Sequence, residues 1–113
     1  MIKLIYCITR RSDLSSEEFS RYWREVHAPI GARIPGLRRL VQSHVTAESS
    51  QIRTPDYDGV AELWFDDLDS LSAARRSIEW RRSSEDEANF IDGTKVAFLI
   101  TEEHEVVVGS EAA

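Results

Sequence analysis

The order of the hydrophobic periodicities limits this chain to very few folds. Alternating apolar residues predict strands at 2–9, 37–46, 59–65 and 94–101, because side chains two residues apart share one face of a strand. Between the first two strands, apolar residues recur at the spacing of a helix. A second helical pattern separates the last two strands. The chain therefore reads β-α-β-β-α-β.

Local signals indicate where the predicted helices begin and break. Residues 15–18 form an S-x-x-E capping box, in which serine and glutamate side chains satisfy free N–H groups of the first turn. The acidic run 66–69 suits the start of the second helical region, because carboxylates favour a helix N-terminus. A further short helical piece is expected over SSEDEANF, residues 83–90. Pro29 has no N–H, so we expect the first helix to end, kink or restart beside His27.

This order of elements is that of the ferredoxin-like α+β fold, in which two helices cover one face of a four-stranded antiparallel sheet. The first strand, 2–9, is apolar on both faces. A bare apolar sheet face is a poor surface for a soluble monomer. We therefore expect a homodimer whose two sheets pack face to face. We expect the folded domain to span residues 1–105 and residues 106–113 to form a flexible C-terminal tail.

Composition and charge narrow the function classes. The chain has 113 residues, the length of one domain, and a formal net charge of −6, which argues against nucleic-acid binding. Its apolar runs are far shorter than the roughly 20 residues that span a membrane, and the N-terminus lacks the pattern of a signal peptide. The single cysteine, Cys7, fits a reducing compartment. We expect a cytoplasmic protein that binds neither nucleic acid nor membrane.

Several blocks of the sequence resemble one known family. Residues 14–45, which include YWREVHAP at 22–29, together with DGVAELWF at 58–65 and IEWRR at 78–82, are similar to the EthD domain of the dimeric α/β-barrel superfamily. The resemblance implies a dimeric α/β barrel with a pocket between each sheet and its helices. The superfamily includes cofactor-free isomerases, cyclases and dehydratases, besides haem enzymes and monooxygenases. EthD proteins themselves accompany a cytochrome P450 system in ether degradation.

The resemblance makes His27 and His44 the candidate catalytic residues. His27 flanks the apolar stripe of the first helix, where the alternative is that it caps a helix end. His44 shares a strand face with Leu40 and Gln42, and the alternative is a purely structural hydrogen bond. Two imidazoles facing one cavity could take a proton from one substrate atom and return it to another. The family often has a tyrosine where this chain has Leu40.

The remaining candidates would shape the site. Tyr6, Trp23 and Trp64 could line a hydrophobic cavity, and Gln42 could bind a ligand. Glu62 lies in mid-strand, where it could orient a histidine or pair with an arginine at the dimer edge. The sequence has no metal-ligand spacing, nucleophile elbow, phosphate loop or dinucleotide fingerprint, so it calls for no metal and no cofactor. A haem held by one histidine stays open.

These observations predict a cofactor-independent acid–base enzyme, of isomerase, cyclase or dehydratase type, acting on a small hydrophobic or aromatic metabolite. One alternative is a non-catalytic binding or accessory protein of an oxidative degradation or biosynthetic pathway. Another is a monooxygenase-type oxidoreductase. The sequence identifies no substrate.

Overall fold

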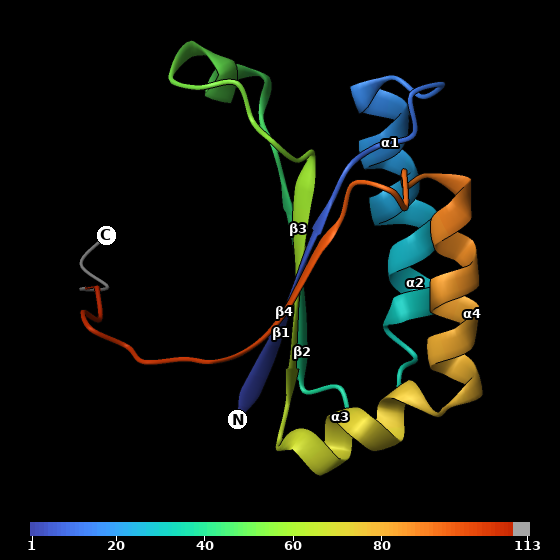
Figure 1. Ribbon diagram of the computed structural model, residues 1–113, viewed down its shortest axis with the longest axis vertical. Coiled ribbons are helices and arrows are strands. Elements are labelled where there is room, and N and C mark those ends of the chain that lie inside the picture. Colours follow the sequence, from blue (N-terminus) through green and yellow to red (C-terminus); the bar gives the residue numbers. More distant parts are fainter. Residues whose placement is uncertain (110–113) are drawn as a thin grey trace.

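Four strands form one antiparallel sheet in the order β2-β3-β1-β4, and the long helices lie on one of its faces (Figure 1). The computed structural model describes residues 1–109. The predicted ferredoxin-like α+β fold is confirmed. The elements are β1 Ile2–Ile8, α1 Ser16–Tyr22, the π-helical segment Trp23–His27, α2 Ala28–Gly31, β2 Arg39–His44, the 3₁₀ segment Ala47–Gln51, β3 Gly59–Phe65, α3 Leu68–Arg75, α4 Ile78–Asp86, the 3₁₀ segment Glu87–Asn89 and β4 Ala97–Glu102.

The register of the sheet decides which side chains face the helices. In the centre of the sheet, Leu4 of β1 pairs with Leu63 of β3. Tyr6 pairs with Ala61 on one side and with Phe98 of β4 on the other. Because directly paired residues point to the same face, these side chains all lie on the helical side of the sheet. The even-numbered residues of β1 therefore contribute to the space between the layers.

Side-chain caps start the helices where the sequence indicates. The Ser15 hydroxyl accepts a hydrogen bond from the Glu18 N–H at 3.1 Å, and the Glu18 carboxylate accepts one from the Ser15 N–H at 2.9 Å. This is the predicted capping box. At the start of α3, the Asp67 carboxylate accepts a hydrogen bond from the Ser70 N–H at 2.8 Å. The acidic run therefore begins the second helical region, as expected.

The core between the layers is built from large apolar side chains. Phe19, Phe65, Phe90 and Leu71 are almost completely buried there. Burying one such side chain contributes about 2 kcal/mol to stability. Gly59 allows a close approach of the two layers, because a Cβ at this position would lie only 2.7 Å from Cη2 of Trp23.

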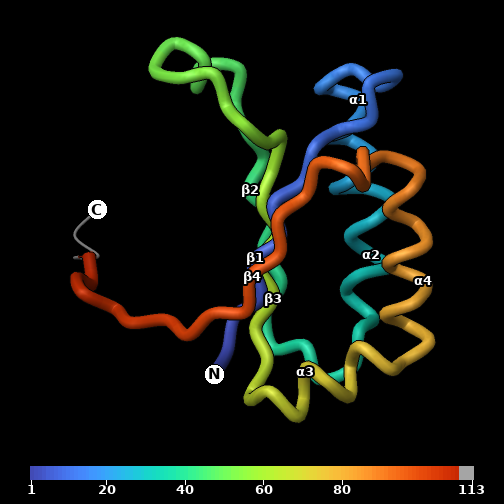
Figure 2. The backbone as a smooth tube through the Cα atoms, in the orientation of Figure 1, coloured from blue at the N-terminus to red at the C-terminus, as the bar shows by residue number. Residues whose placement is uncertain are grey.

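The other face of the sheet carries no helix. The loop that joins β2 to β3 and the segment after β4 both extend to this side (Figures 1 and 2). Leu99, which alternates with the helix-facing Phe98, is 51% exposed here. Residues 106–109 of the predicted tail belong to no helix or strand, and residues 110–113 lie outside the described residues. Within residues 1–109, no helix is long and apolar enough to cross a membrane.

Candidate functional site

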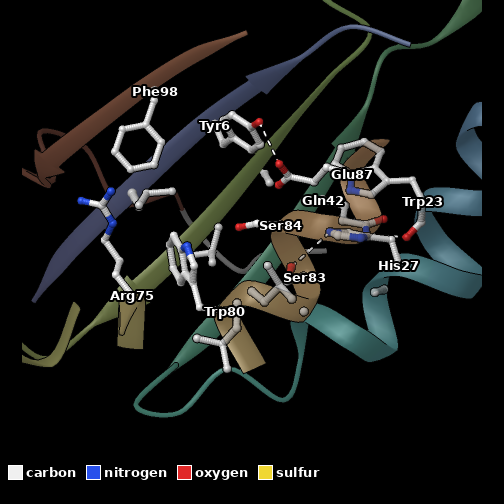
Figure 3. Close-up of a pocket in the computed structure, with 17 residues that line it drawn as sticks. Tyr6, Trp23, His27, Gln42, Arg75, Trp80, Ser83, Ser84, Glu87 and Phe98 are labelled. Atoms are coloured by element: carbon white, nitrogen blue, oxygen red, sulfur yellow. Dashed lines mark hydrogen bonds between the residues drawn. The ribbon is translucent and has the colours of Figure 1, made fainter. Parts of the chain in front are cut away.

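A cavity of about 240 Å³ lies between the sheet and the helices (Figure 3). Its walls are mainly apolar or aromatic, and a few polar side chains converge on it, as in typical small-molecule sites. The apolar and aromatic lining includes Leu4, Trp23, Ile34, Leu40, Leu63, Trp80 and Phe98, and the polar lining is Tyr6, His27, Gln42, Arg75, Ser83, Ser84 and Glu87.

His27 reaches this cavity from a π-helical segment. The N–H of Ala28 donates to the carbonyl of Trp23, five residues earlier, so the helix is locally wider than an α-helix. Pro29 follows at once and lacks an N–H, so the α-helical hydrogen-bond ladder is incomplete there in any case. The interruption expected beside Pro29 thus takes the form of a π-helical segment, after which α2 continues. The alternative reading, in which His27 caps a helix end, does not describe its contacts, because its side chain makes no capping hydrogen bond here.

The largely buried carboxylate of Asp86 holds the His27 ring. Nδ1 of His27 lies 2.8 Å from Oδ2 of Asp86, and the two side chains are only 12% and 11% exposed. The Tyr22 hydroxyl donates to the other carboxylate oxygen at 2.6 Å, and the Asn89 amide donates to it at 3.0 Å. The ring centroid of His27 also lies 4.8 Å from that of Phe90. These contacts fix the orientation of the imidazole.

The charges of this pair favour a neutral histidine beside an ionised aspartate. Burial lowers the pKa of His27 below its ordinary value, although the nearby Asp86 carboxylate opposes this. Burial alone would raise the pKa of Asp86, but the hydrogen bonds from Tyr22, His27 and Asn89 together hold that pKa below its ordinary value. Nδ1 then carries the proton that is donated to Asp86. Nε2, which lies 3.5 Å from the Ser83 hydroxyl, is left unprotonated on the cavity side.

Glu87 is the second titratable group of the cavity. It follows α4 directly, and it accepts a hydrogen bond from the Tyr6 hydroxyl at 3.2 Å, which Figure 3 shows as a dashed line. Burial raises the pKa of Glu87 to about 7, and the nearby Asp86 charge adds to this, whereas the Tyr6 hydrogen bond opposes it. Glu87 thus keeps its proton to a higher pH than an ordinary glutamate. It can donate a proton where His27 can accept one.

His44 does not line the cavity, although it lies on the predicted strand face. Its ring packs against the ring of Trp23, with centroids 4.3 Å apart. Nδ1 of His44 lies 2.7 Å from the Ser20 hydroxyl, and Nε2 lies 2.8 Å from the Gln42 amide oxygen. The Gln42 amide in turn donates to the Trp23 carbonyl at 2.9 Å. His44 therefore supports the wall that Trp23 and Gln42 form. Its hydrogen bonds are of the purely structural kind that was the alternative to a catalytic role.

Of the residues predicted to bind a ligand, Tyr6, Trp23 and Gln42 lie in the wall of the cavity, but Glu62 and Trp64 do not. Both lie on the bare face, because Leu63 between them faces the helices. Within this chain, Glu62 pairs with Lys3 at 2.7 Å. Trp64 donates its indole N–H to Glu103.

The sequence interpretation missed several cavity residues on the second helical region. Trp80, Ser83, Ser84 and Glu87 are spaced by 3, 4 and 7 residues from the first, so they share one face of α4 and its continuation. A search for apolar stripes does not detect this pattern, because three of the four residues are polar. The pairing of Asp86 with His27 joins positions 59 residues apart, which no local pattern indicates.

The part of the chain that the structure describes, residues 1–109, contains no group of three or more His, Cys, Asp or Glu side chains that could hold a metal ion. The only cysteine, Cys7, is free.

A ferredoxin-like sheet with a ligand-sized cavity under its helices defines a small α+β protein with a pocket between its two layers. The EthD domain model matches residues 11–94, and the chain belongs to the EthD domain family. The chain is similar, at 29% identity and a TM-score of 0.77, to an EthD family protein of Bacillus halodurans, over 92% of this chain and 99% of that one.

More distant solved structures share the fold. SnoaB of Streptomyces nogalater, described as a cofactor-independent oxygenase, is 14% identical with a TM-score of 0.65, over 94% of this chain and 95% of that one. A protein of unknown function from Bacteroides fragilis, described as dimeric and ferredoxin-like, is 16% identical with a TM-score of 0.64, over 90% and 95% of the two chains. No curated protein matches the chain significantly.

Proposed function

We propose that this protein is a cofactor-independent enzyme that moves protons on a small hydrophobic or aromatic metabolite. The observation that carries this proposal is that His27, held by the largely buried Asp86, lines the same cavity as Glu87. The environments of the two groups shift their pKa values in opposite directions, so that one is a base and the other an acid near neutral pH. This is the equipment of an isomerase, a cyclase or a dehydratase.

The proposed reaction begins when Nε2 of His27 removes a proton from a carbon beside a carbonyl group of the substrate. The electron pair of the broken C–H bond moves towards the carbonyl, and Glu87 donates its proton to the carbonyl oxygen. Asp86 stabilises the imidazolium that forms, because it accepts the Nδ1–H hydrogen bond. The isomerisation is completed when His27 gives its proton to a different substrate atom while the enol hydroxyl returns its proton to Glu87 and the carbonyl re-forms, which restores both groups.

Of the two predicted catalytic histidines, this proposal keeps His27 and replaces His44 by Glu87. His44 is engaged by Ser20 and Gln42 behind the Trp23 ring. Its proposed role is to position Trp23 and Gln42 at the cavity wall. The apolar lining around these groups supports a hydrophobic substrate, because such walls exclude water from the reacting atoms.

The proposed activity can be tested before its natural substrate is known. The protein is incubated in D₂O with aromatic ketones, namely 1-tetralone, 2-tetralone and propiophenone, and deuterium incorporation beside the carbonyl is followed by NMR. We expect the wild type to accelerate the exchange of at least one ketone, and His27→Gln to lose about 10²-fold or more of that rate. His104→Gln, which changes an exposed histidine outside the cavity, is the control.

No accelerated exchange with any of these ketones, or full activity of His27→Gln, would contradict the proposal. Ligand binding without exchange would instead favour the non-catalytic binding or accessory protein. The described oxygenase activity of SnoaB belongs to that protein, and at 14% identity the likeness supports only the fold.

The protein is further proposed to be a homodimer that joins through the bare face of the sheet. Exposed Leu99 and half-buried Ile5 and Val41 give this face its apolar character. Ferredoxin-like neighbours from Bacteroides fragilis and Thermobifida fusca are described as dimeric, which supports the same arrangement. A cytoplasmic location remains a proposal that rests on the free Cys7.

A further inference from the structure

Arg75 places a positive charge at the mouth of the cavity. It is the last residue of α3, and its side chain lines the cavity together with Trp80 and Phe98. Its guanidinium carbon lies 6.0 Å from the ring centroid of Trp80 and 5.8 Å from that of Phe98. Figure 3 shows these three side chains together, at the opposite end of the cavity from His27. Both distances are within the range of a cation–π contact, which favours this position of the cation.

The Arg75 guanidinium has no acidic partner among residues 1–109. Arg11 and Arg38, by contrast, form ion pairs with carboxylates of this chain at 2.7 Å and 2.9 Å. No carboxylate of the described residues lies within 4.0 Å of the guanidinium of Arg75, although it borders a cavity. Its N–H donors are therefore available to a ligand, and a guanidinium suits a carboxylate best because it can donate two parallel hydrogen bonds.

The charges of the cavity are arranged along its length. The ionised Asp86 lies behind His27 at one end, where it repels an anionic group of a ligand. Arg75 attracts such a group to the other end. The chain as a whole carries a formal net charge of −6, so an anion is drawn to the cavity only by a local cation. A ligand with one charged and one apolar end would thus bind in a single orientation.

We propose that the cavity takes an aromatic carboxylate, whose carboxylate binds Arg75 while its apolar body lies between Trp80, Phe98 and the sheet. This inference deepens the proposed function, and it rests on that function for the reaction that follows binding. The reacting carbon of the ligand would then lie at the end of the cavity opposite Arg75, beside His27. Arg75 is a binding and specificity residue, and it takes no part in the proton transfer. A neutral analogue of the same shape should bind more weakly.

The test compares two ligands that differ only in charge, naphthalene-1-carboxylate and naphthalene-1-carboxamide, by isothermal titration calorimetry at pH 7.5 in low salt. We expect the wild type to bind the carboxylate about tenfold more tightly than the amide, the size of a charge-assisted hydrogen bond. Arg75→Gln should lose this preference and bind the amide as before. Arg76→Gln is the matched control, because this exposed neighbour lies outside the cavity and should keep the preference.

Equal affinity of the wild type for the two ligands would overturn the inference, and so would an unchanged preference in Arg75→Gln or no binding of either ligand. The outcome is distinct from that of the deuterium exchange. Loss of exchange with an intact carboxylate preference would refute the acid–base function and leave an anion-binding pocket. Exchange without a carboxylate preference would refute the role of Arg75 and leave the acid–base function standing.

Discussion

The substitution Glu87→Gln should change how the stability of the protein depends on pH. Burial raises the pKa of Glu87 from the ordinary 4.5 to about 7 in the folded chain. Between these two pH values, the unfolded chain has lost the proton that the folded chain still binds. The free energy of unfolding therefore falls as the pH rises through this window, and the contribution of Glu87 to stability is largest on the acidic side. Glutamine cannot ionise, so in the variant this position causes no fall in the free energy of unfolding as the pH rises.

The magnitude follows from the size of the pKa difference. About 2.5 pH units correspond to about 3 kcal/mol, at roughly 1.4 kcal/mol per unit. Part of this stabilisation is already lost at pH 5, because Glu87 of the unfolded chain begins to ionise at about pH 4.5. With an allowance for partial contact of Glu87 with solvent, the wild type should lose about 2 kcal/mol through this group between pH 5 and pH 8. The Tyr6 hydroxyl keeps an acceptor in the glutamine side chain.

The assay is urea unfolding followed by tryptophan fluorescence at pH 5, 6, 7 and 8, at one fixed protein concentration. The free energy of unfolding of Glu87→Gln, taken relative to the wild type, should rise by about 2 kcal/mol across this range. Glu85→Gln, which removes the same charge from an exposed position of α4, is the control. Its free energy of unfolding should change with pH in the same way as that of the wild type. If the free energy of unfolding of Glu87→Gln also follows the wild type across the pH range, Glu87 has an ordinary pKa and cannot be the proposed acid.

Three further substitutions test other parts of the structure. Gly59→Ala should destabilise the fold by about 2 kcal/mol or more in urea unfolding, because its Cβ would overlap the Trp23 ring; unchanged stability would mean that the two layers can separate at no cost. Tyr22→Phe removes the 2.6 Å hydrogen bond to Asp86 and should cost about 1–2 kcal/mol at pH 7, whereas an equal midpoint would show that this bond adds nothing. Leu99→Glu should yield a monomer in size-exclusion chromatography with light scattering, and a dimer that survives it would place the interface elsewhere.

The fold could be predicted from sequence because the signals that specify it are local. The alternation in β1 and β3 located these strands but did not decide which face of β3 meets the helices, so Trp64 was expected at the cavity that Leu63 lines. The capping box at Ser15 marked the start of α1. Each of these signals is contained in fewer than ten residues. The loop segments, by contrast, turned out to include the 3₁₀ segment Ala47–Gln51, which composition alone described only as a loop.

The candidate site could be predicted only in part, because it depends on contacts between distant segments. His27 was found from its place beside the apolar stripe, but its partner Asp86 comes from another helix. His44 was placed on the correct face, yet the Trp23 ring lies against it, and the size and direction of that ring cannot be read from strand alternation. Glu87 resembles any surface glutamate until the packing of α4 against Tyr6 buries it.

The most direct test of the central claim is the protonation state of His27, measured by long-range ¹H–¹⁵N NMR of the imidazole nitrogens from pH 5 to pH 8. The His27 signals are assigned by their absence in His27→Gln. We predict a neutral ring at pH 7 with the proton on Nδ1, bound to Asp86, and a pKa below the ordinary 6.5. Nε2 is then free to accept a proton from a substrate. A ring that is protonated at pH 7, or a neutral ring with its proton on Nε2, would contradict the account, because His27 could not act as the base of the cavity.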